Sequence, residues 1–204
     1  MTAELTAMTG DPKRYDYTAD GVEWAAFEWT AGGDYSITTT EGVLDALLVG
    51  AGTKSNNNNN GDGGDVVHAY ASVSGGPHDL KVGAANDSIH IKTTTFDDAN
   101  LWAGGGPGGA GWGAGGRMGY DQSTGGWPVA SSAVGNPAGI PNSITGTEVV
   151  YAYGCPRSTF FPGQVDAGTP GSGGIYGTTN GGGQDGTVIV RVPASKVSAT
   201  GGWV

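Results

Sequence analysis

The residues of this 204-residue chain with the clearest potential for binding chemistry are aromatic side chains set along a glycine-rich block. The block LWAGGGPGGAGWGAGG spans 101–116 and has few side chains beyond its two tryptophans. Flat rings on glycine loops can stack on sugars, although packing of loops onto the domain is the favoured role, since each ring buries a large area. If the chain contacts a receptor, the candidate residues are Trp102, Trp112, Tyr120, Asp121 and Trp127, with Gln122 and Asn136 as further hydrogen-bonding groups.

Catalytic patterns are weak in this sequence. Asp97 and Asp98, with Glu148 or Asp166, are candidates for the carboxylate pair of a glycosidase, but no feature of the sequence sets two of them at a working separation. The chain has no GxSxG motif, and its glycine runs lack the Gly-Lys-Ser/Thr that a phosphate-binding loop requires. We therefore expect no catalytic residues and a protein that is not an enzyme.

Metal and cofactor signals are also weak. His68, His78 and His90 have no fixed spacing, and half-buried strand histidines are more common than ligands. The segment NNNNNGDGGD at 56–65 has oxygen donors, but it fits no calcium-loop spacing and is better explained as a polar turn region. Cys155 is the single cysteine, which excludes an internal disulfide and a cysteine-based zinc site. We expect no metal and no cofactor.

The charge balance limits the partners. The net charge is −10 with nine Lys and Arg in total and no basic run, so nucleic acid and anionic membrane surfaces are not expected partners. The first residues, MTAELTAMTGDPKRYDY, lack the basic and apolar regions of a signal peptide, and the longest apolar run, at 43–52, is too short to span a bilayer. These features predict assembly in a cytoplasm, without membrane insertion.

Glycine is the outlier of the composition, with 41 of 204 residues, about three times the usual share of roughly 7%. Each glycine inside a strand or helix costs about 0.5–1 kcal/mol relative to alanine. Either much of the chain is loose, or many glycines occupy positions where only glycine fits, or neighbouring subunits supply further contacts. Glycine also allows extended segments to hydrogen-bond closely with no side chains between them.

Several short segments have the composition of strands. β-Branched residues and period-two alternation indicate strands at 34–40, 43–50, 65–73, 78–84, 87–95, 147–154 and 186–193, with a weaker signal at 22–29. No helical period occurs, and 103–146 is a long segment without a period. The pattern predicts an all-β protein, an antiparallel β-sandwich with long glycine-rich loops and no significant helix. The strands at 43–50, 65–73, 147–154 and 186–193 are expected to supply its core.

The expected domain organisation has three parts. Residues 1–21 are polar and without period, which predicts an N-terminal arm. Residues 22–193 form the glycine-rich β-sandwich domain, and 194–204 form a C-terminal tail. The arm and the tail are expected to attach to neighbouring subunits.

The order of these segments resembles the glycine-rich domain of phage minor tail proteins. The likeness covers about 35–193 and rests on LLVGAG (47–52), GGDVVHAYASVSGGPHDLKVGAAN (63–86) and GGGQDGTVIVRVP (181–193). Arg191 stands where the family places an arginine, whereas Asn56 to Asn60 and GAAND (83–87) replace glycines that are usual there. The resemblance implies a virion structural protein of the tail, tail tip or fibre.

By analogy with tail-tip fibres, the resemblance implies a homotrimer that assembles with other virion tail proteins, in the host cytoplasm, into the virion tail. Exposed loop tips could then contact a glycan of the host cell surface. Three alternatives stay open: a capsid decoration protein, a glycine-rich bacterial surface protein, and an envelope-degrading glycosidase.

Overall fold

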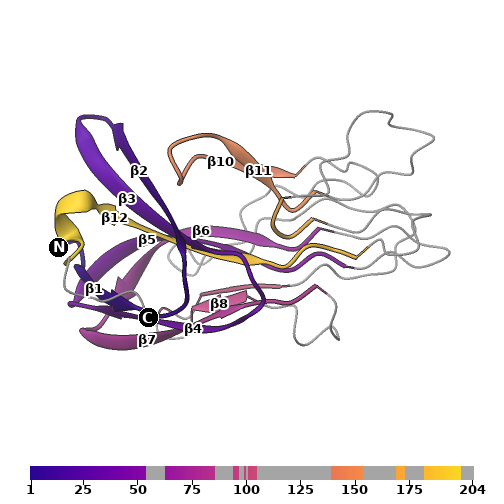
Figure 1. Cartoon of the computed structure of the whole chain (residues 1–204), viewed down its shortest axis with the longest axis horizontal. Coiled ribbons are helices and arrows are strands. Elements are labelled where there is room, and N and C mark those ends of the chain that lie inside the picture. The colour runs from indigo at the N-terminus through magenta and orange to yellow at the C-terminus, as the bar shows by residue number, and fades with distance from the viewer. Residues whose placement is uncertain are drawn as a thin grey trace.

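The computed structural model describes residues 1–53, 63–85, 94–96, 99, 101–104, 139–153, 169–172 and 182–198. Two five-stranded antiparallel sheets pack face to face, and a two-stranded hairpin lies against one of them (Figure 1). The elements are β1 (Leu5–Met8), β2 (Lys13–Ala19), β3 (Val22–Trp29), β4 (Gly33–Thr39), β5 (Gly42–Val49), β6 (Val66–Val73), β7 (Gly76–Val82), β8 (Thr94–Phe96), β9 (Leu101–Ala103), β10 (Ile140–Asn142), β11 (Val149–Tyr151), β12 (Thr187–Pro193) and the 3-10 turn η2 (Ala194–Lys196).

The all-β sandwich predicted from the sequence is confirmed. Sheet A has the order β2-β3-β12-β5-β6, and sheet B has the order β1-β4-β7-β8-β9. β12 lies in the middle of sheet A, between β3 and β5. Sheet A therefore combines strands from the beginning and from the end of the described chain. In the part of the chain that the structure describes, no helix is long and apolar enough to cross a membrane.

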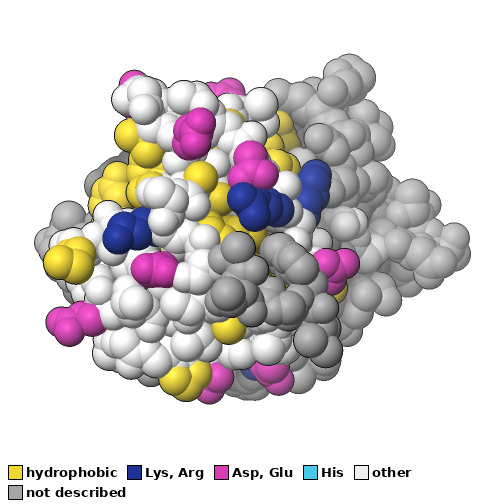
Figure 2. All heavy atoms as spheres, turned by 60° about the vertical axis from the view of Figure 1, so that its left-hand side comes forward, with side chains coloured by type: hydrophobic (Ala, Val, Ile, Leu, Met, Phe, Trp, Pro, Cys, Tyr) yellow, Lys and Arg dark blue, Asp and Glu magenta, His cyan; other side chains and the backbone are white. Residues whose placement is uncertain are grey.

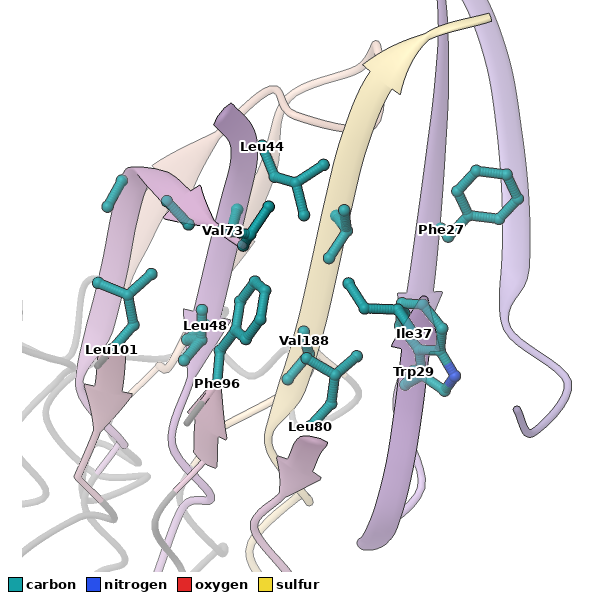
Figure 3. Packing of buried hydrophobic residues seen from close by; sticks show 14 of the residues in the cluster. Phe27, Trp29, Ile37, Leu44, Leu48, Val73, Leu80, Phe96, Leu101 and Val188 are labelled. Carbon is teal, nitrogen blue, oxygen red and sulfur yellow. The ribbon is translucent and has the colours of Figure 1, made fainter. Parts of the chain in front are cut away.

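The main core lies between the facing sides of the two sheets (Figure 3). Alternation along β6 shows the cause: Val67, Ala69, Ala71 and Val73 are buried, while the residues between them are exposed. Sheet A adds side chains from β3, β5 and β12, and sheet B adds side chains from β4, β7, β8 and β9. The largest members are Leu5 of β1 together with Phe27, Trp29, Ile37, Leu44, Leu48, Leu80, Phe96 and Leu101.

Residues 1–21 are not an arm, which corrects the domain division expected from the sequence. β1 pairs with β4 at one edge of sheet B, and β2 pairs with β3 at one edge of sheet A. The polar composition that suggested an arm arises because edge strands expose one side, and β2 alternates exposed and half-buried residues along its length. The end of the described chain also packs on the sandwich, since the Ser198 amide donates to the Leu5 carbonyl at 3.0 Å.

The segment at 147–154 was expected to supply the main core, but it does not join that core. It contributes β11, which pairs with β10 in a separate hairpin that covers part of the outer face of sheet A. Tyr151, Ile144 and Ala152 form a second apolar cluster there with Leu47 and Ile189 of the sheet. The strand expected at 87–95 is described only from 94 onward, as β8.

The charges are dispersed over the end of the molecule that carries the N-terminus. Figure 2 shows acidic side chains scattered among uncharged ones, with a few Lys and Arg side chains between them. On this face they form no continuous basic surface.

Candidate functional site: the glycine-packed end

The ends of many strands meet at one end of the sandwich. β5 ends at Val49 opposite the start of β6 at Val66, and the start of β12 at Thr187 pairs with Val49 as well. β7 ends at this end of the molecule, β8 begins there and β9 ends there, since Thr94 lies opposite Ala103. The right-hand side of Figure 1 shows these strand ends together. We call this region the glycine-packed end, with the backbone segments 50–53, 63–65, 104, 171–172 and 182–186.

Backbone hydrogen bonds join these segments although they are far apart in the sequence. Gly50 N–H donates to the Asp65 carbonyl at 2.9 Å, and Asp65 N–H donates to the Gly104 carbonyl at 2.8 Å. In the same way, Gly64 N–H donates to the Gly171 carbonyl at 2.9 Å, and Gly52 N–H donates to the Gln184 carbonyl at 2.9 Å. Buried backbone groups need such partners, and here other backbone groups supply them outside the regular sheets.

Close backbone approach explains why these positions are glycine. A Cβ on Gly64 would lie 1.9 Å from the Gly50 carbonyl oxygen, and a Cβ on Gly50 would lie 2.0 Å from the Gly104 oxygen. At Gly52 the nearest atom would be the Ser172 oxygen, also at 2.0 Å. Gly171 in addition has φ +76°, a conformation that favours glycine. The glycines therefore allow carbonyl groups to occupy the space of side chains.

Two polar side chains connect the glycine-packed end to both sheets. Thr94 of sheet B donates its hydroxyl to the Val49 carbonyl of sheet A at 2.7 Å. The Asp185 carboxylate accepts from the Gly32 amide at 2.9 Å and from the Ala85 amide at 2.8 Å. The strand ends are thus fixed relative to one another.

Only one of the binding residues predicted from the sequence lies in the described part of the chain. Trp102 is in β9, where Leu101 and Ala103 are buried and its own side chain is 41% exposed. Trp112, Tyr120, Asp121 and Trp127, with Gln122 and Asn136, lie outside the described residues. The grouping of these aromatic residues stays a prediction.

Two of the histidines are held by packing and hydrogen bonds, while His90 lies outside the described residues. His78 is 1% exposed, lies 2.8 Å from the Thr39 hydroxyl and meets the Phe96 ring edge-on. Within the described ranges, no three His, Cys, Asp or Glu side chains are grouped as metal ligands.

A polar network on the outer face of sheet A was missed by the sequence analysis. Asp45 of β5 lies directly opposite Arg191 of β12, accepts from its Nε at 2.9 Å and also bonds to its Nη2. His68 Nε2 lies 2.7 Å from the other Asp45 oxygen. Burial opposes the charge of Arg191, but the Tyr17 hydrogen bond and the Asp45 carboxylate outweigh it and raise the Arg191 pKa. Period-two alternation in the sequence indicates which charged residues lie on the same face of a sheet. Which of these residues lie opposite each other depends on the register between the strands, which the alternation does not give.

The ends of this network attach the β10–β11 hairpin. The Asn142 oxygen accepts from the Ile144 amide at 2.8 Å, so its NH₂ group faces His68 Nδ1 at 3.0 Å and donates to it. His68 Nε2 must then carry the proton that is donated to Asp45. Tyr17 accepts from Arg191 at 2.9 Å and donates to the Ile144 carbonyl at 2.7 Å. Both ring nitrogens of His68 are engaged, which suits a positioning role and leaves neither nitrogen available as a general base.

Comparison with protein-family models, curated proteins and solved structures finds no match to this chain at any of the three levels.

Proposed function

We propose that this chain is a structural protein of a phage virion, a minor tail, tail-tip or fibre component. The observation that supports the proposal is the glycine-packed end, where backbone segments remote in sequence contact one another without intervening side chains. The order of the strand and glycine motifs resembles the glycine-rich domain of minor tail proteins. The described polar network is fully hydrogen-bonded within the chain and offers no free nucleophile or base, which suits contact rather than catalysis.

Assembly is the proposed mechanism. The sandwich holds the ends of β5, β6, β9 and β12 together. The asparagine-rich sequence 54–62 and the glycine-rich sequence 173–181 are bounded on both sides by residues of this end, and the glycine-rich sequence 105–138 follows directly after Gly104 of it. Glycine-rich backbone can form further hydrogen bonds with the backbone of a neighbouring copy or of another tail protein. The proposed assembly is a homotrimer, in which loop tips contact a glycan of the host cell surface.

The virion assignment is tested by immunogold labelling of phage particles induced from a strain that carries the gene. Antibodies against the chain are expected to label the tail. Labelling of the head would place the chain on the capsid as a decoration protein. Labelling of the cell envelope, with none on particles, would contradict the proposal and favour a bacterial surface protein.

Two measurements on the purified chain complete the test. Light scattering is expected to give a mass three times that of the 20.3 kDa chain, and a monomer would contradict the trimer. Incubation with host cell walls is expected to release no sugar. Release of reducing sugar would instead favour the envelope-degrading glycosidase.

A further inference from the structure

A pocket of about 650 Å³ lies beside the glycine-packed end, between the outer face of sheet A and the β10–β11 hairpin. Its volume is within the range of small-molecule sites, which is about 300–1,000 Å³. Sheet A contributes one wall of the pocket and β11 contributes a second. Residues 182–185 of the glycine-packed end contribute a third wall. Among the described residues, those that give the lining its chemistry are Tyr15, Glu28, Thr30, Tyr151, Thr169 and Gln184.

Glu28 is the most unusual group of this pocket. Its side chain is on the outer face of β3, and the residue is only 8% exposed. One carboxylate oxygen accepts from the Tyr15 hydroxyl, and among the described residues the other oxygen has no hydrogen-bond partner. Buried carboxylates normally have their oxygens satisfied, so a ligand that brings hydrogen-bond donors would complete this site.

The other residues that line the pocket indicate what kind of ligand fits. Thr30 and Thr169 bring hydroxyl groups and Gln184 brings an amide, each able to donate and to accept. Glu28 and Asp185 are acidic, and no Lys or Arg is among the described lining residues, which disfavours phosphate, sulfate and other anions.

Tyr15 and Tyr151 give the pocket apolar ring surface beside its polar groups. Burial raises the pKa of both phenols, so they stay neutral, and Tyr15 remains a donor to Glu28. Lys13 Nζ already lies 4.6 Å from the centroid of the Tyr15 ring, so a cationic ligand on this ring would be repelled by a neighbouring charge.

We propose that the pocket beside Glu28 binds a neutral saccharide unit. The saccharide hydroxyls would donate to the open Glu28 oxygen and exchange hydrogen bonds with Thr30, Thr169 and Gln184. The C–H face of the sugar would pack against the rings of Tyr15 and Tyr151. This inference does not require the chain to be a virion component, so its test and the particle labelling fail independently.

Saturation-transfer NMR on the full chain tests the proposal. The probes are methyl glycosides of glucose, galactose, mannose and N-acetylglucosamine, with choline as a cationic probe. At least one saccharide is expected to receive saturation from the protein, and calorimetry then measures its Kd. Glu28→Gln is expected to weaken that binding at least about tenfold, which corresponds to about 1.4 kcal/mol.

Glu41→Gln is the matched control, since Glu41 is exposed in the turn between β4 and β5 and does not line the pocket. It is expected to leave the Kd unchanged. If Glu28→Gln does not fold, Gln184→Ala is the second variant, because its backbone hydrogen bonds do not depend on the side chain. The proposal is overturned if no saccharide binds at about 10 mM, if choline binds instead, or if Glu41→Gln weakens binding as much as the pocket variants do.

Discussion

Arg191 of β12 and Asp45 of β5 face each other directly across sheet A, with Arg191 Nε 2.9 Å from an Asp45 carboxylate oxygen. The Asp45 side chain is 4% exposed and that of Arg191 is 18% exposed. The Arg191 guanidinium also stacks over the Trp24 ring at 4.5 Å. This pair is the centre of the network that holds the β10–β11 hairpin on the sheet.

We expect Arg191→Met to lower the free energy of unfolding by about 3 kcal/mol, because it leaves a buried carboxylate with only His68 as partner. Urea unfolding measures the change. The double variant Asp45→Leu with Arg191→Met is expected to recover much of the loss, since an apolar pair carries no desolvation cost. A double variant less stable than the single one would contradict this account.

Gly64→Ala is expected to destabilise the protein by about 3 kcal/mol, because its Cβ would lie 1.9 Å from a backbone oxygen that cannot rotate away. Gly33→Ala is the control, since its nearest neighbour would be at 3.5 Å. There the stability should change by at most about 1 kcal/mol. Thermal and urea unfolding compare the two, and similar losses would mean that close backbone packing is not the reason for glycine at Gly64.

Asn142→Ala is expected to loosen the β10–β11 hairpin selectively, since it removes the hydrogen bonds to His68 and to the Ile144 amide. The local cost is about 1 kcal/mol. Hydrogen exchange followed by mass spectrometry should show faster exchange over 139–153. The amides of β12 serve as the internal reference, and equal acceleration there would indicate global destabilisation instead.

Stability is expected to fall above about pH 10 because of one buried and two half-buried tyrosines. Burial raises the pKa of Tyr15, Tyr35 and Tyr151 above the ordinary value of 10.0. The folded chain then holds protons that the unfolded chain releases, so the free energy of unfolding decreases as pH rises. For Tyr151, which is 1% exposed, the slope is about 1.4 kcal/mol per pH unit.

Unfolding in urea between pH 9 and 12 measures this dependence, and Tyr151→Phe is the control that keeps the ring. The variant should have a shallower slope than the parent chain. An unchanged slope would show that Tyr151 ionises as readily in the folded chain as in the unfolded one.

The local pattern of the sequence determined which segments are strands and that they form an all-β sandwich. The alternation in VVHAYASV and the β-branched run in TVIVRV are properties of neighbouring residues, and the structure places β6 and β12 there. The same reasoning failed for 1–21, because an edge strand such as β2 has few buried side chains and resembles a polar arm.

The tertiary structure alone decided which strands are neighbours, and hence the site. Asp45, His68 and Arg191 are up to 146 residues apart, and only the antiparallel register of β5, β6 and β12 brings them together. The purpose of Gly50, Gly52 and Gly64 could not be read from composition either, since a glycine does not reveal which distant carbonyl will occupy the place of its absent Cβ. The period of the sequence indicates which side chains are buried, whereas the contacts between strands depend on which strands the fold places side by side.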